Sequence, residues 1–134
     1  MKYTIGIDME EISRIEKIVL EHPVFLKRFF TENERVEFEK KGKGLYQSVT
    51  GSFCAKEAFS KALGSGLSSF TYKGQKIICK LNSIEVLHDE FGKPYINLVD
   101  SLEVLNGVIA TDVSITHTNT TAGAVVLMIF NDDD

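Results

Sequence analysis

Several acidic, basic and imidazole side chains lie near the ends of the elements that the sequence predicts. Asp8 closes an apolar run that begins at Tyr3, where a carboxylate either caps the following helix or meets a cation. Glu57 and Lys61 are one helical turn apart. They form either a solvated ion pair, or a site in which Glu57 binds a cation and Lys61 contacts a phosphate. His117 ends an alternating run, and its imidazole can donate to a phosphate. The chemistry that these residue types share is the binding of a hard cation and of phosphate.

Other chemical signatures are weaker or missing from the sequence. Lys93 lies in a Gly-Lys-Pro turn, which is either only a turn or a turn that presents the lysine to an anion. Neither Gly42-Lys43-Gly44 nor Gly64-Ser65-Gly66 extends into a nucleotide-binding glycine loop. The histidines are too scattered for a zinc-binding pair. The sequence therefore directs attention to carboxylates and lysines.

The helices expected in the first half of the chain are set by hydrophobic spacing and by end signals. An isoleucine-rich helix begins at Ile12 and ends at Pro23, and a Thr-x-x-Glu capping box predicts another helix from about residue 32. A third helix covers residues 45–63, and Gly64 is placed to end it in a left-handed conformation. The apolar stripe of this helix consists of Ala55, Ala58, Phe59 and Ala62.

The second half of the chain is predicted to be rich in strands. The expected strands are residues 77–80, 83–87, 95–98, 110–117 and 122–130, with an N-terminal strand over 3–8. The last two form a closing hairpin. Helices followed by strands predict an α+β fold, with the helices packed on an antiparallel sheet. We expect one domain over residues 1–131 and an acidic tail over 132–134.

The composition of the 134-residue chain limits the classes of protein that it can be. A formal net charge of −4 argues against broad nucleic-acid binding, which needs a basic surface. The longest apolar run, Ala122 to Phe130, is too short for a membrane-spanning helix. Cys54 and Cys79 lie in apolar stretches, which indicates buried thiols in a reducing compartment. We expect a cytoplasmic protein with neither a nucleic-acid nor a membrane partner.

Taken together, these motifs resemble the holo-[acyl-carrier-protein] synthases, which are the short bacterial type of 4′-phosphopantetheinyl transferase. The resemblance covers most of the chain, and its motifs occur in the same order. They are Ile5-Gly6-Ile7-Asp8 with Ile12 and Arg14, Arg28-Phe29-Phe30-Thr31 with Glu34, residues 51–66, Ile84-Glu85-Val86, Gly92-Lys93-Pro94 and residues 113–118. The stretch from Lys56-Glu57-Ala58 to Gly66 is the most specific.

The resemblance implies transfer of the phosphopantetheine arm of coenzyme A to a serine of apo acyl carrier protein, with release of adenosine 3′,5′-bisphosphate, for fatty acid biosynthesis. It implies that Asp8 and Glu57 hold Mg²⁺ against the pyrophosphate. Glu57 and Lys61 are the implied catalytic residues, with Glu57 the base for the serine, directly or through a metal-bound water. The implied coenzyme A contacts are Lys61, Gly64, Ser65, Lys93 and His117.

The resemblance also implies partners. An acidic carrier protein suits a local basic surface on the first helix and just after it, although ordinary solvated charges are the alternative because acidic residues interleave. This carrier surface consists of Arg14, Lys17, Lys27 and Arg28. Phe25 and Phe29 are expected in the core rather than in an apolar spot for the carrier. Family members of this length are typically homotrimers with active sites between subunits.

The sequence departs from the family pattern at a few positions. Ser52 stands where arginine is usual, and Cys54 where alanine is usual. A lysine in the longer stretch that follows Ser68 is a candidate replacement for the missing arginine; these are Lys73, Lys76 and Lys80. The alternatives are a non-catalytic module that binds coenzyme A or a carrier protein, a purely structural domain, and a transferase for carrier domains of polyketide or peptide synthetases.

Overall fold

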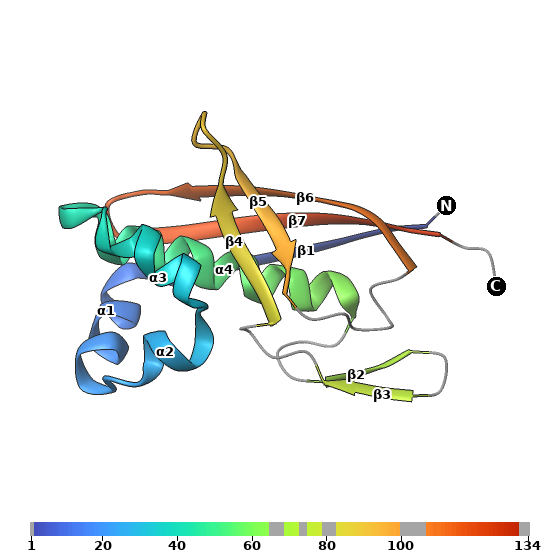
Figure 1. Ribbon diagram of the computed structural model, residues 1–134. Helices are drawn as coiled ribbons and strands as arrows, with labels where there is room; N and C mark the ends of the chain where they lie inside the picture. Colours follow the sequence, from blue (N-terminus) through green and yellow to red (C-terminus); the bar gives the residue numbers. More distant parts are fainter. Residues whose placement is uncertain (1, 65–68, 73–74, 79–82, 100–106, 132–134) are drawn as a thin grey trace.

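The computed structural model describes residues 2–64, 69–72, 75–78, 83–99 and 107–131 (Figure 1). The helices are α1 (Ile12–Glu21), α2 (Phe25–Phe29), α3 (Glu32–Glu39), the 3₁₀ turn η1 (Gly42–Gly44) and α4 (Leu45–Leu63). The strands are β1 (Lys2–Glu11), β2 (Ser69–Tyr72), β3 (Gln75–Ile78), β4 (Ile84–His88), β5 (Pro94–Leu98), β6 (Val108–His117) and β7 (Thr121–Phe130). None of the helices in the described part of the chain has the length and apolar character to cross a membrane.

The main sheet joins the two ends of the chain. It has three antiparallel strands in the order β1-β7-β6, and Asp8 of β1 lies opposite Ala124 of β7. β4 and β5 form a separate antiparallel hairpin that projects across the molecule, and β2 pairs with β3 (Figure 1). Strand residues alternate between the two faces of the sheet, so one face carries small apolar side chains toward α4. On β7 these are Ala122, Ala124, Val126 and Met128, all buried.

Helix α4 packs along this face of the sheet and forms the larger core. Its predicted apolar stripe is fully buried against β6 and β7, together with Cys54. Gly6 is the reason that β1 lies so close to α4, because a Cβ atom built there would be 1.9 Å from the carbonyl oxygen of Ala58. A strand that touches the helix backbone places the side chains of β1 beside those of the last turns of α4.

A second core lies where α1, α2 and α3 pack around the first half of α4. It is built from aromatic and branched side chains, with the Phe25 and Phe53 rings 6.0 Å apart and the Phe30 and Phe38 rings 5.1 Å apart. Phe25 is buried and Phe29 half-buried in this cluster, so the expectation that both belong to the core is confirmed. Helix α4 is thus the shared centre of both cores.

Most of the predicted elements are found. The capping box of α3 is complete, with Thr31 and Glu34 bonded reciprocally, and α4 has the predicted bounds. The short helix α2 and the strand β2 were not predicted as elements. Gly64 ends α4 with a φ of 91°, the left-handed conformation expected there. Cys54 is a buried free thiol, whereas Cys79 and the tail 132–134 lie outside the described residues.

Candidate active site

Asp8 lies at the edge of the sheet, beside the end of α4. Its Oδ1 accepts a hydrogen bond from Nζ of Lys61 at 3.2 Å, and the same ammonium donates to the carbonyl oxygen of Ile7 at 3.0 Å. The interpretation of Asp8 as a helix cap is wrong, because Glu11 occupies the N-cap position of α1. The structure thus gives Asp8 a cation partner.

Glu57 lies one turn before Lys61 on α4, half-buried and close to other carboxylates. Burial, followed by the negative charges of Asp8 and Glu10, raises the pKa of Glu57 to about 7. Lys61 and Arg14 act in the opposite direction. We call Asp8, Glu10 and Glu57 with Lys61 the acidic site; like charges gathered in this way favour a proton or a cation. Glu10 is a member that the sequence did not reveal.

Oδ2 of Asp8 is buried and has no hydrogen-bond partner in the described structure. A buried carboxylate oxygen without a donor is costly, and a cation ligand removes that cost. Among the described residues there is no group of three or more His, Cys, Asp or Glu side chains fit to hold a metal. Mg²⁺ does not need one, since it is commonly held by one or two carboxylates with phosphate oxygens and water. Asp8 and Glu57 therefore fit a magnesium ion.

Cys54 lies behind this site on the preceding turn of α4. Its Sγ is 3.6 Å from the carbonyl oxygen of Ala122, and no part of the residue is exposed. Burial and the nearby charge of Asp8 raise the pKa of the Cys54 thiol to about 12, so the thiol stays protonated. Cys54 therefore fills the back of the site without adding charge to it.

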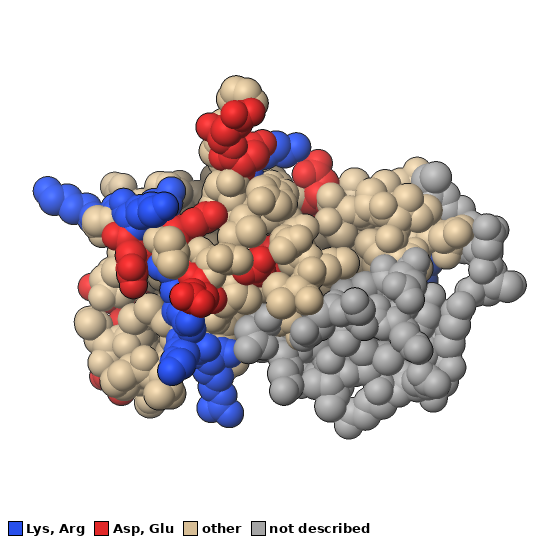
Figure 2. All heavy atoms as spheres, viewed as in Figure 1, with Lys and Arg blue, Asp and Glu red and all other residues tan. Residues whose placement is uncertain are grey.

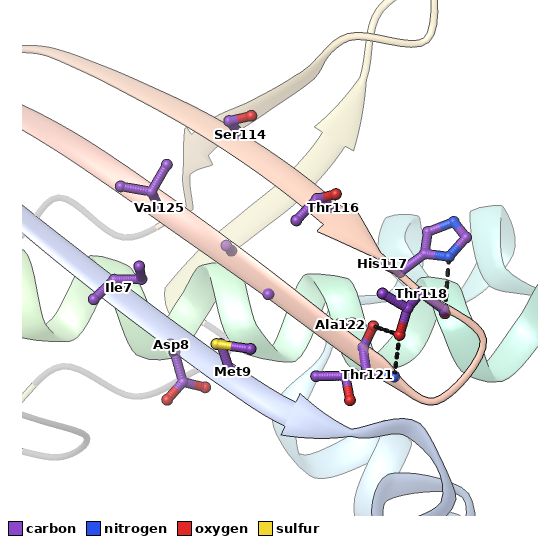
Figure 3. Close-up of a pocket in the computed structure, with 12 residues that line it drawn as sticks. Ile7, Asp8, Met9, Ser114, Thr116, His117, Thr118, Thr121, Ala122 and Val125 are labelled. Atoms are coloured by element: carbon purple, nitrogen blue, oxygen red, sulfur yellow. Dashed lines mark hydrogen bonds between the residues drawn. The ribbon is translucent and has the colours of Figure 1, made fainter.

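The candidate coenzyme A contacts fall into two groups in one chain. Gly64 ends α4 one turn after Lys61, with open space where a side chain would begin. Ser65 lies outside the described residues. His117 ends β6, separated from the β1 edge that carries Asp8 by β7 (Figure 3). Lys93 lies in the β4–β5 turn, exposed, with Nζ 3.8 Å from Oδ1 of Asp112. Asp8 and His117 both border a hollow on the outer face of the sheet, whereas Lys93 is not among the residues that line it.

A cleft of about 350 Å³, which we call the second cleft to separate it from the acidic site, lies between the start of α4, the β4–β5 hairpin and the end of β6. His117 lines it, as does Ser52, the serine at the position where the family usually has arginine. Lys41 and His88 also line this cleft, and Gly92 and Pro94 place the Lys93 turn at its rim. Sequence reasoning missed Lys41 and His88 because their cleft forms only when the hairpin folds over α4. The earlier candidates Lys73, Lys76 and Lys80 have side chains outside the described part of the structure.

The predicted carrier surface lies on α1 and α2. Its side chains are all exposed, and Arg14 pairs with Glu10 of the acidic site. Basic and acidic side chains are interleaved over this helical end of the molecule (Figure 2). Arg14 thus joins the carrier surface to the acidic site, a connection between a strand and a helix that helical spacing does not indicate.

A buried ion pair that the sequence analysis did not predict lies on another side of α4. Nζ of Lys56 is 2.6 Å from Oε1 of Glu34, and both side chains are fully buried. The sequence contained one signal, because Lys56 stands in the buried stretch of α4 next to Ala55 and a charge there requires a partner.

Comparison with known proteins identifies the family. Residues 4–116 match the model of the 4′-phosphopantetheinyl transferase superfamily. A holo-[acyl-carrier-protein] synthase of Clostridium botulinum is 42% identical over 126 residues, covering 92% of this chain and 94% of that protein. One of Caldanaerobacter subterraneus is 36% identical and covers 96% of each chain. The chain belongs to the 4′-phosphopantetheinyl transferase superfamily.

Solved structures agree with this assignment. The holo-(acyl-carrier-protein) synthase of Bacillus anthracis, in complex with coenzyme A (3′,5′-ADP), matches with a TM-score of 0.75 at 36% identity over 96% of both chains. The Helicobacter pylori synthase in complex with coenzyme A matches with a TM-score of 0.75 at 33% identity, over 93% of this chain and 99% of that one. The predicted α+β transferase fold and the predicted enzyme class are confirmed: the chain is a 4′-phosphopantetheinyl transferase.

Proposed function

We propose that this transferase is a magnesium-dependent holo-[acyl-carrier-protein] synthase. Its donor is coenzyme A, its acceptor a serine of apo acyl carrier protein, and its second product adenosine 3′,5′-bisphosphate. The observation that carries the proposal is the buried Oδ2 of Asp8, which has no hydrogen-bond partner among the described residues and lies beside Glu57. Native proteins pair nearly all buried polar groups, so a buried carboxylate oxygen of this kind favours a ligand.

Asp8, Glu57 and Lys61 of the acidic site each have a role in this reaction. Asp8 and Glu57 would hold Mg²⁺, and the bound ion would neutralise negative charge on the pyrophosphate. The serine oxygen forms the new bond to the phosphorus of the pantetheine side, and the bisphosphate leaves with the electron pair of the broken P–O bond. Glu57 is the candidate acceptor of the serine proton. Lys61 remains tied to Asp8 and Ile7 and directs its remaining N–H toward phosphate oxygen.

The second cleft supports a role in coenzyme A binding on a neighbouring subunit. His117, Lys41 and His88 make it suited to a phosphate group, and Lys41 is a candidate replacement for the arginine missing at Ser52. Lys41→Ala should raise the KM for coenzyme A about tenfold, the loss expected for one charge-assisted hydrogen bond of about 1.5 kcal/mol. The exposed neighbour Lys40→Ala is the matched control, and an equal KM in both variants would contradict this assignment.

A homotrimer with active sites between subunits is supported by the outer face of the sheet. Tyr3, Ile5, Ile7 and Met9 project from β1 away from α4 and are each more than 60% exposed. This apolar face continues onto β7 through Val125 and Leu127. Ile7, Met9 and Val125 border an apolar hollow of about 260 Å³ on it (Figure 3). Apolar faces of this kind are usually covered by another chain.

Light scattering should give three times the chain mass, and Ile5→Glu should give a monomer without transferase activity.

The carrier surface completes the proposal. Arg14, Lys17, Lys27 and Arg28 are exposed and suited to an acidic carrier protein, and Arg14 contacts Glu10 of the acidic site. The proposed substrates place the enzyme in the cytoplasm, where the buried Cys54 remains reduced.

The test is the intact mass of apo acyl carrier protein after incubation with the enzyme, coenzyme A and Mg²⁺. We expect a gain of one phosphopantetheine group, lost with EDTA and in Glu57→Gln, and retained in the exposed control Glu39→Gln. A folded protein that binds coenzyme A without any mass gain would favour the binding-module alternative. Mass gain only on polyketide or peptide synthetase carrier domains would move the acceptor to that class.

A further inference from the structure

The buried pair of Lys56 and Glu34 fixes the end of helix α2. Nζ of Lys56 donates to Oε1 of Glu34 at 2.6 Å and to the carbonyl oxygen of Phe29, the last residue of α2, at 2.8 Å. The same ammonium lies 4.7 Å from the centre of the Phe30 ring. A lysine on α4 thus contacts both residues at the point where α2 ends.

Glu34 extends this contact to α3 and β4. Its Oε1 also accepts from the backbone N–H of Thr31 at 3.0 Å, and its Oε2 accepts from the backbone N–H of Val86 at 3.0 Å. The Thr31 hydroxyl in turn donates to Glu85. Every side-chain oxygen of Glu34 is therefore partnered, which is what a buried carboxylate needs in order to remain in the core.

The two neighbours Lys56 and Glu57 connect this pair with the reaction site. Successive residues on a helix point about 100° apart. Lys56 therefore points into the α2–α3 junction while Glu57 points into the acidic site. The helix held by Lys56 is short and carries Lys27 and Arg28, both exposed and both part of the proposed carrier surface. The ring contact of Phe25 with Phe53 also holds α2 against α4.

We propose that Lys56 is a positioning residue for the carrier protein. By bonding the carbonyl oxygen of Phe29 and the carboxylate of Glu34, it holds Lys27 and Arg28 at a fixed position relative to Glu57. An acyl carrier protein docked on those side chains then presents its serine at the acidic site. The inference rests on the proposed function, because it concerns how the acceptor of that reaction is aligned.

The test replaces the pair without leaving a buried charge. Lys56→Met alone strands the Glu34 carboxylate and can fail to fold, so the measured variant is Lys56→Met/Glu34→Gln. We expect the KM for acyl carrier protein to rise about tenfold, with the KM for coenzyme A changed less than about twofold. Met128→Val, in the other core and fully buried, is the control for lost stability. A purely structural role would lower the melting temperature of both variants and leave both KM values unchanged.

A mutant cycle tests whether the pair acts through α2. In the Lys27→Ala/Arg28→Ala background, replacing the pair should add less than about twofold to the KM for the carrier. The inference is overturned if the folded pair variant keeps the wild-type carrier KM. It is also overturned if Lys27→Ala/Arg28→Ala leaves that KM unchanged, or if the two effects multiply independently. Failure of the proposed function is a separate result, namely no transfer by the wild-type enzyme.

Discussion

Two groups of charged side chains each include residues of helix α4. They differ in whether every buried carboxylate oxygen has a hydrogen-bond partner. The buried pair Glu34–Lys56 has a hydrogen-bond partner for each carboxylate oxygen. In the acidic site, Oδ2 of Asp8 has no hydrogen-bond partner among the described residues, and the pKa of Glu57 is raised by burial and by neighbouring carboxylates. The two groups meet on α4, where Lys56 of the buried pair directly precedes Glu57 of the acidic site.

This difference separates structural charge from functional charge. Satisfied buried charges specify how elements dock, whereas unsatisfied ones are retained where a ligand completes them. We therefore expect substitutions in the acidic site to remove activity at little cost in stability, and substitutions that leave one charge of the buried pair alone to lower stability strongly.

Asp8→Asn is the substitution with the largest expected effect on activity. It removes a proposed Mg²⁺ ligand and should lower kcat/KM about 10²- to 10³-fold, the range for lost electrostatic stabilisation of a transition state. Because Lys61 is half-exposed, losing its ion pair should cost less than about 1 kcal/mol of stability. Steady-state kinetics and thermal melting measure the two effects. Asp112→Asn, the exposed partner of Lys93, is the control, and equal losses in both would argue against the metal site.

Lys56→Met tests how much the buried pair contributes to stability. A glutamate left buried without its cation should lower the free energy of unfolding by about 3–5 kcal/mol. Burial already raises the pKa of Glu34, with the Lys56 ammonium acting in the opposite direction. Urea denaturation should show that Lys56→Met/Glu34→Gln is more stable than Lys56→Met alone. If the double variant is the less stable of the two, the pair is not stabilised as described.

Gly6→Ala tests the backbone contact that brings β1 to α4. Its Cβ would fall 1.9 Å from the Ala58 carbonyl oxygen, so the strand must move, at a cost of about 1–3 kcal/mol. Activity should fall as well, because Asp8 moves with the strand. Gly44→Ala is the control, since the nearest atom to a Cβ there is 4.0 Å away and its φ is −86°. Equal melting temperatures would contradict the close approach.

The smallest expected effect is the pH dependence of Mg²⁺ binding at Glu57. With a pKa of about 7, Glu57 is mostly protonated at pH 6 and ionised at pH 8, so protons compete with Mg²⁺ below neutrality. Affinity for Mg²⁺ should be about tenfold weaker at pH 6 than at pH 8. The metal-free protein should lose stability as pH rises toward 7, because its raised pKa favours the protonated form, and Mg²⁺ should restore it. Calorimetry on the wild type and Glu57→Gln measures this, and a variant with the same pH dependence would refute it.

The elements could be predicted from local signals, whereas the contacts between them could not. Spacing alone predicted α4, its left-handed end at Gly64 and the capping box at Thr31 and Glu34. The bond from Glu34 to Lys56 joins residues on different helices, and no local pattern encodes that distance. The residue types alone allowed Asp8 and Glu57 to share a cation but favoured a helix cap and a surface ion pair, and only the family resemblance favoured the shared site. The second cleft escaped prediction for the same reason, because it depends on how the β4–β5 hairpin lies over α4.

The pairing of β1 with β7 has a consequence for synthesis on the ribosome. Lys2 lies opposite Phe130, so two strands far apart in the sequence pair with each other, and among the described strands β1 has no other neighbour. Until residues 121–130 emerge from the exit tunnel, β1 lacks its strand partner, and pairing between such distant segments folds slowly. The carboxylates of the acidic site are therefore fixed in place only after β7 has been made. A nascent chain arrested before β7 should have no ability to modify a carrier protein.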